Sequence, residues 1–167
     1  MSLRVILRWP DARLRMVCAP VPEVTPEIHA LAGDLLETMY AAPGRGLAAP
    51  QVGEVCRVFV MDTGWKEGVP QPRVFVNPEI LARSDDTVTR AEGCLSIPGV
   101  SVDVTRPAEI TLRWTDLEGR VQQDRLTGFA AACAQHEIDH LDGRVTFDRL
   151  TAEARALAEA QFVDVSA

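Results

Sequence analysis

Apolar residues in the first quarter of the chain recur at helical spacing. Thr25 and Pro26 are residue types typical of an N-cap and a first helical position. The residues after them place apolar side chains three or four positions apart, on one face of a helix: Ile28, Leu31, Leu35, Leu36 and Met39. The pattern predicts a helix from Pro26 to about Tyr40, followed by a loop at Gly44-Arg45-Gly46. A short helical turn is expected earlier, at 11–17.

The middle of the chain alternates apolar and polar residues with a period of two, which is typical of strands that bury one face. The alternating segments are short, and turn sequences such as Asp116-Leu117-Glu118-Gly119 separate them. We expect strands at 57–62, 73–77, 87–91, 100–105, 109–115 and 120–125. Short strands that follow one another along the chain favour antiparallel pairing.

Helical spacing returns after the last expected strand. Thr127 suits an N-cap and Gly143 suits the position just after a helix. One face between them carries Phe129, Ala130, Cys133, Glu137, His140 and Leu141. A last helix is predicted from Thr151 to about Phe162. The order helix, strands, helix, helix predicts an α+β fold, and residues 1–167, which contain no linker or repeat, are expected to form a single domain.

Composition narrows the classes of function. The 167 residues are 47% apolar and 25% charged, as in folded water-soluble proteins, and the formal net charge is −7. A negative field repels phosphate, which argues against direct DNA binding and nucleic-acid binding in general. No apolar run approaches the ~18 residues of a membrane span, and the N-terminus lacks a secretory pattern. We therefore expect a cytoplasmic protein with no membrane association and with four reduced cysteines: Cys18, Cys56, Cys94 and Cys133.

The segment Gln135-His136-Glu137-Ile138-Asp139-His140 carries the candidate chemistry. Histidines four residues apart on a helix point the same way, so both can bind one metal ion, and Glu137 beside them can take a proton from a water on that metal. The alternative is an exposed polar patch or a pair of core histidines. That alternative must explain why polar groups share an apolar face, where burial without partners costs several kcal/mol.

Two histidines leave a tetrahedral metal short of one protein ligand. No histidine follows His140, which excludes the metzincin pattern with its third histidine downstream. Two candidates remain from the residues alone. Cys94, in Glu92-Gly93-Cys94-Leu95-Ser96, offers a thiolate that suits Fe²⁺ or Zn²⁺. Glu159 lies at a spacing that some metalloproteases use, and composition does not choose between the two.

Three segments together resemble the signature motifs of the peptide deformylase family, in the same order and at similar separations. They are Gly44-Arg45-Gly46-Leu47-Ala48-Ala49-Pro50-Gln51, Glu92-Gly93-Cys94-Leu95-Ser96 and Gln135-His136-Glu137-Ile138-Asp139-His140. The resemblance covers about residues 4–150. It implies antiparallel β-sheets packed around a central helix that carries the H-E-x-x-H motif, with N-terminal and C-terminal helices. It also implies a metal-dependent hydrolase that removes the formyl group from the formylmethionine of nascent polypeptides and releases formate.

The resemblance also implies individual roles. The implied ligands of one divalent metal ion are Cys94, His136 and His140. Similar proteins use Fe²⁺ natively and accept Zn²⁺, Ni²⁺ or Co²⁺. Glu137 is implied to act as general base and then as general acid. The Gln51 side-chain amide and the Leu95 backbone N–H are implied to form the oxyanion hole.

The same resemblance implies a substrate pocket with two unusual residues. The implied pocket residues are Gly44, Arg45, Gly46, Arg90, Glu92, Gly93, Phe129, Ala132 and Cys133. Segment 44–46 would pair with the substrate backbone, and Glu92 would form an internal ion pair with Arg106. Arg45 and Arg90 stand where aliphatic residues are usual. Their side chains either extend into solvent or favour a different N-acyl substrate, which is the alternative function.

The C-terminal segment departs from the family as well. Some bacterial members carry a basic C-terminal helix that docks on the ribosome, whereas residues after Arg149 include only Arg155 against three acidic residues, Glu153, Glu159 and Asp164. Transient ribosome association through this segment is therefore not expected.

Two further alternatives to the deformylase function are a metal-binding partner protein without turnover and a short metallopeptidase that uses Glu159.

Overall fold

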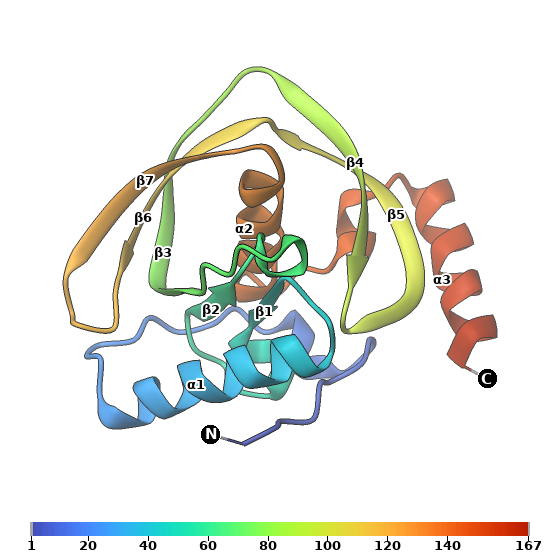
Figure 1. Ribbon diagram of the computed structural model, residues 1–167. Coiled ribbons are helices and arrows are strands. Elements are labelled where there is room, and N and C mark those ends of the chain that lie inside the picture. Colours follow the sequence, from blue (N-terminus) through green and yellow to red (C-terminus); the bar gives the residue numbers. More distant parts are fainter. Residues whose placement is uncertain (1, 167) are drawn as a thin grey trace.

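Two antiparallel sheets flank a central helix, α2 (Gly128–Leu141), in the computed structural model, which describes residues 2–166 and side chains as far as residue 163 (Figure 1). The larger sheet has the order β1-β2-β3-β6-β7 and the smaller one pairs β4 with β5. The strands are β1 (Gly46–Ala48), β2 (Val58–Met61), β3 (Arg73–Arg83), β4 (Thr87–Cys94), β5 (Ile97–Pro107), β6 (Glu109–Thr115) and β7 (Val121–Thr127). Helix α2 packs against strands of both sheets.

The other two helices cover the strands from outside. Helix α1 (Pro26–Ala41) packs on β1 and β2, and α3 (Ala152–Ser166) packs along β5 (Figure 1). The connections within residues 2–166 contain four short 3-10 helices: η1 (Ala12–Arg15), η2 (Ala49–Val52), η3 (Trp65–Glu67) and η4 (Thr146–Arg149). None of the helices in residues 2–166 is long and apolar enough to cross a bilayer.

The predicted α+β fold class is confirmed, and each predicted strand is found. The prediction of a continuous loop at Gly44-Arg45-Gly46 was wrong at its last residue, because β1 begins at Gly46. Pairing of Gly46 with Met61 on β2 outweighs the low strand propensity of glycine. Strand β3 continues to Arg83, beyond the predicted end at Asn77, through two register shifts against β6. The side chain of Asp164, which entered the charge argument above, lies outside the described residues.

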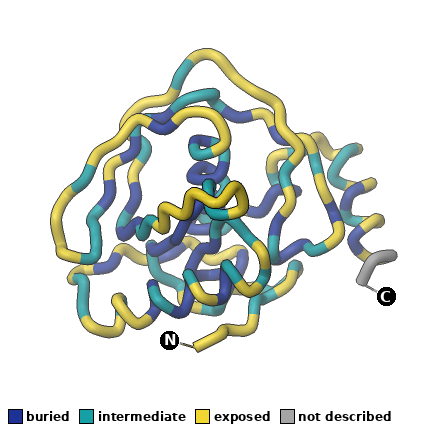
Figure 2. Tube along the Cα trace, in the orientation of Figure 1, coloured by how far each residue is buried: buried dark blue, intermediate teal, exposed yellow. Residues whose placement is uncertain are grey.

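Helix α2 is buried along most of its length (Figure 2). Small residues such as Ala131 and Ala134 face a core in which Phe59 and Phe75 stack with ring centroids 4.4 Å apart. The same helix also buries polar side chains that an apolar core does not accommodate without partners: Gln135, Glu137, Asp139 and His140. The partners of these groups define the site.

Candidate metal centre

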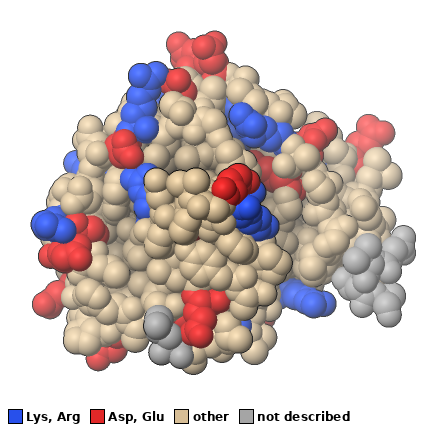
Figure 3. Space-filling view, viewed as in Figure 1, with Lys and Arg blue, Asp and Glu red and all other residues tan. Residues whose placement is uncertain are grey.

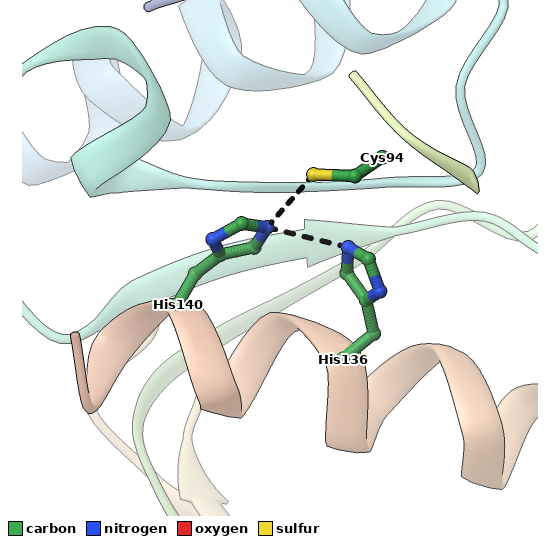
Figure 4. Close-up of side chains that lie close together, drawn as sticks. All are labelled: Cys94, His136 and His140. Carbon is green, nitrogen blue, oxygen red and sulfur yellow. Dashed lines mark hydrogen bonds between the residues drawn. The ribbon is translucent and has the colours of Figure 1, made fainter. Parts of the chain in front are cut away.

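His136 and His140 project from α2 toward Cys94 at the end of β4 (Figure 4). The His140 Nε2 atom lies 3.2 Å from His136 Nε2 and 3.4 Å from Cys94 Sγ. Cys94 is 8% exposed, His140 is 1% exposed, and the His136 side chain is 11% exposed. The structure therefore brings together three of the predicted residues from two elements, although Cys94 lies 42 residues before His136 in the sequence (136 − 94).

The cluster fits a divalent metal ion. One ligand atom from each of Cys94, His136 and His140 lies within 4.8 Å of the other two, and a thiolate with two imidazoles is a donor set that suits Zn²⁺ and Fe²⁺. Among the described residues, the buried Oε2 of Glu137 has no hydrogen-bond partner, so an acceptor stands free beside the cluster. Glu159 lies elsewhere, on α3, where its Oε1 accepts a hydrogen bond from Arg155 Nε at 2.6 Å.

The charges and hydrogen bonds around Cys94 favour the thiolate, which is the form of cysteine that binds metals. Burial alone would raise the pKa of the Cys94 thiol, but the charge of His140 and hydrogen bonds with both histidines outweigh burial and hold that pKa well below its usual value. Burial raises the pKa of Glu137 to about 7, against the opposing charges of His136 and His140. The site thus contains a thiolate and a carboxyl group that can exchange a proton near neutral pH.

Gln51 on η2 reaches the same cluster. Its Oε1 accepts a hydrogen bond from the Ala48 N–H at 2.9 Å, which fixes the direction of the amide. Its Nε2 donates to Ser96 Oγ at 3.1 Å and faces Cys94 Sγ at 3.7 Å. A fully buried amide donor therefore points at the sulfur side of the cluster.

A buried ion-pair network supports His136 from behind. Glu92 Oε2 lies 3.1 Å from His136 Nδ1, so Nε2 of that ring is left to face the cluster. The Arg106 guanidinium donates to both carboxylate oxygens of Glu92, at 2.6 and 2.9 Å, and to Asp139 at 2.8 Å. Arg149 donates to both oxygens of Asp139. The predicted Glu92–Arg106 pair is thus internal rather than a pair of surface charges.

Replacing Arg106 with Met is expected to lower the free energy of unfolding by about 3–5 kcal/mol, because the variant leaves the carboxylates of Glu92 and Asp139 buried without their shared cation. Denaturant unfolding of the purified protein measures the change. Arg113→Met is the matched control, since the Arg113–Glu79 pair is equally short, at 2.6 Å, but lies on the surface. Equal losses in both variants would contradict the interpretation.

A cavity of about 420 Å³ opens onto the cluster. The predicted residues that line it are Gly44, Arg45, Gly46, Gln51, Glu92, Gly93, Cys94, Leu95, Phe129, Ala132, Cys133, His136 and Glu137. Arg90 is not among the lining residues; it is exposed on β4 and borders a separate, smaller hollow. At Gly46 an added Cβ would clash with Glu137 Oε1 and lie 3.0 Å from Cys133 Sγ, so a larger residue there would displace the Glu137 carboxylate.

Arg45 turns away from the cluster toward the loop that follows β2. Its guanidinium donates to the Thr63 carbonyl at 2.6 Å and to both carboxylate oxygens of Glu67, at 2.5 and 3.1 Å. The same group lies over the Phe129 ring, 5.2 Å from its centroid. Its charge is therefore matched by a carboxylate rather than free in the cavity.

Sequence reasoning missed several parts of the cavity wall, which include Pro43 and Ala91 next to predicted residues. Residues 97–100 directly follow the cysteine segment, and their place after that motif was the only available clue. Lys66 on η3 also lines the cavity. It is the one lysine among 17 basic residues, and this count was the single feature that distinguished it.

Comparison with known proteins agrees with this geometry. The sequence matches the polypeptide deformylase family over residues 3–156. Peptide deformylases of Afipia carboxidovorans and Rhodopseudomonas palustris are each 52% identical to the chain, over 141 and 143 residues, and each match covers 84% of this chain and 82% of the relative.

Solved structures share the fold. A peptide deformylase from Legionella pneumophila superposes with a TM-score of 0.92 at 36% identity, covering 99% of this chain and 96% of the other. A peptide deformylase from Ehrlichia chaffeensis in complex with actinonin gives a TM-score of 0.92 at 37% identity, covering 99% and 98%. Because the sequence match runs through nearly the whole chain and the fold agrees as well, the chain belongs to the polypeptide deformylase family.

Proposed function

We propose that Cys94, His136 and His140 hold the divalent metal ion with which this enzyme works. The chain is a peptide deformylase, a hydrolase that removes the formyl group from the N-terminal formylmethionine of nascent polypeptides. The convergence of one cysteine and two histidines beside a buried, unpaired carboxylate oxygen is the observation that carries the assignment of residues. A divalent metal at such a site supplies Lewis acidity and makes hydroxide available from water at neutral pH.

Glu137 is proposed to carry the proton. Its carboxyl group, with a pKa of about 7, accepts a proton from the attacking water as oxygen adds to the formyl carbon. When the C–N bond breaks, Glu137 gives that proton to the leaving nitrogen, so formate and a free methionyl N-terminus are released. The free Oε2 of Glu137 is available for this transfer because no described group occupies it.

Gln51 and Leu95 are proposed to stabilise the oxyanion that forms on the formyl oxygen. The hydrogen bond from Ala48 holds the Gln51 amide so that Nε2 faces the cluster. Leu95 follows Cys94 directly and lines the same cavity, which supports its backbone N–H as the second donor. Removing one such donor typically costs about 10²–10³-fold in kcat.

Strand β1 is proposed to bind the substrate backbone. It forms one edge of the larger sheet next to β2, and no other strand among the described residues covers its second edge, which lies beside the cavity. An extended peptide can add to such an edge through main-chain hydrogen bonds. Phe129, Ala132 and Cys133 on α2 are proposed to receive the methionine side chain, and Gly44, Gly46 and Gly93 leave room for the substrate backbone.

The metal and the cellular setting are also part of the proposal. A thiolate ligand favours Fe²⁺, with Zn²⁺, Ni²⁺ or Co²⁺ as substitutes. We place the enzyme in the cytoplasm, where formylated chains are made, and treat residues 1–167 as one catalytic domain. Ribosome docking through α3 is not expected, because Arg155 is paired with both Glu159 and Asp148. On the face drawn in Figure 3, basic and acidic side chains are interspersed without an extended basic area.

The proposed function is tested by measuring formate release from formyl-Met-Ala-Ser. The protein is purified and loaded with Fe²⁺ in the absence of oxygen. We expect turnover that a chelator removes and that reloading with Fe²⁺ or Ni²⁺ restores, because the ligands of the proposed site are protein side chains that survive metal removal. Formate release that is unchanged after the metal is removed would contradict the assignment.

A further inference from the structure

The rim of the active-site cavity carries a rigid loop. Asp62, at the end of β2, is fully buried, and its carboxylate accepts hydrogen bonds from the backbone N–H groups of Gly64, Trp65 and Gln71 at 3.1–3.2 Å. It also accepts one from the Tyr40 hydroxyl at 2.7 Å. One buried carboxylate therefore ties both ends of the loop at 62–71 to α1, so the side chains on η3 are presented from a fixed backbone.

The same loop is joined to the segment that precedes β1. The Trp65 indole N–H donates to the Gly44 carbonyl at 2.8 Å, and the Arg45 guanidinium donates to Glu67. The Arg45 carbonyl accepts a hydrogen bond from the Asp62 N–H at 2.9 Å. Helix η3 thus lies beside the segment that leads into β1, and its Lys66 lines the same cavity as Gly44 and Gly46, where the substrate backbone is proposed to bind.

The charges along this rim do not cancel. Arg45 and Glu67 neutralise each other, and the Lys66 ammonium has no carboxylate within 4.0 Å among the side chains described. Its Nζ lies 5.6 Å from the centroid of the Trp65 ring, and its charge also acts on Glu67, which Arg45 already pairs. Of the two acidic residues that line the cavity, Glu92 is paired with Arg106, and Glu137 lies beside the histidine–cysteine cluster. One uncompensated positive charge therefore lines a cavity in a chain with a net charge of −7.

We propose that Lys66 makes this deformylase selective for formylmethionyl chains that carry an acidic side chain shortly after the methionine. The inference rests on the proposed function, because it requires the peptide to leave the cavity along β1. A solvent-exposed ammonium–carboxylate pair supports a preference of about two- to fivefold. Because the contact lies away from the reacting atoms, it acts alike on bound substrate and transition state, so the preference belongs in KM rather than kcat.

The test compares kcat/KM for formyl-Met-Ala-Ser, formyl-Met-Asp-Ser, formyl-Met-Ala-Asp and formyl-Met-Lys-Ser. We expect the wild-type enzyme to prefer at least one acidic peptide over formyl-Met-Ala-Ser by about two- to fivefold at low salt, with less preference at ~0.5 M salt. Lys66→Gln is expected to remove the preference, Lys66→Glu to reverse it in favour of formyl-Met-Lys-Ser, and Lys66→Arg to keep it.

Arg144→Gln is the matched control, since it removes one exposed positive charge outside the active-site cavity and is expected to leave the preference intact. Equal kcat/KM for the neutral and acidic peptides in the wild type, or a preference that persists in Lys66→Gln, would overturn the inference. Failure of the proposed function is a different result: no formate from any of the four peptides.

Discussion

Glu137→Gln is expected to lower kcat for deformylation by about 10²–10⁴-fold while the protein keeps its metal. The substitution preserves the size of the side chain but removes the group that accepts and returns the proton. Since Glu137 is not one of the three converging ligand atoms, metal binding should be unaffected. Formate release and metal content, measured on the same sample, check both halves of the prediction.

The control for this prediction is Glu159→Gln. It makes the same chemical change on α3, where Glu159 pairs with Arg155 outside the cavity, and we expect activity close to that of the wild type. A Glu137→Gln enzyme with more than about a tenth of wild-type kcat would rule out the proton-transfer role, since a positioned base normally contributes at least about 10²-fold.

Cys94→Ala is expected to abolish both metal binding and activity. The substitution removes the only sulfur of the cluster and leaves two imidazoles, and even loss of a residue that merely supports a ligand typically weakens metal affinity by about 10–100-fold. We therefore expect an affinity loss greater than about 100-fold, measured by competition with a chelator of known affinity.

Cys56→Ala provides the comparison for the cysteine. That thiol is partly buried in the cluster that includes α1 residues, and it is absent from both the metal cluster and the cavity wall, so its loss should leave metal content unchanged. Full metal content in Cys94→Ala would contradict the ligand assignment. The two variants are complementary, because Glu137→Gln separates catalysis from metal binding and Cys94→Ala removes both.

Periodic patterns made the helices and most strands predictable. The spacing of Leu31, Leu35 and Met39 fixes a buried face on α1, and the paired histidines of α2 follow from a four-residue interval. Strand β1 could not be predicted in this way, since Gly46-Leu47-Ala48 has little strand propensity of its own and becomes a strand only by pairing with β2.

The parts of the site that could not be predicted from the sequence are those that depend on long-range contacts. The residues alone left Cys94 and Glu159 as rival ligands, because nothing local shows which one faces the histidines across the fold. The resemblance favoured Cys94, and the structure brings that cysteine to within 3.4 Å of His140. The direction of the Arg45 side chain could not be predicted for the same reason. Its partner Glu67 lies 22 residues away, on a loop whose position depends on the buried Asp62.

The smaller sheet has a consequence for how the enzyme unfolds. A two-stranded hairpin such as β4–β5 has little stability alone, and this one is held to α2 through Glu92, Arg106 and Cys94. A metal ion that binds Cys94 together with the histidines of α2 binds only when the hairpin is packed against that helix. Its binding energy therefore opposes separation of the hairpin from α2. The hairpin and the metal site therefore form one cooperative unit, and oxidation of the Cys94 thiol would loosen both at once. Amide hydrogen exchange along β4 and β5 should slow when metal is added, whereas exchange along β6 and β7 should change little.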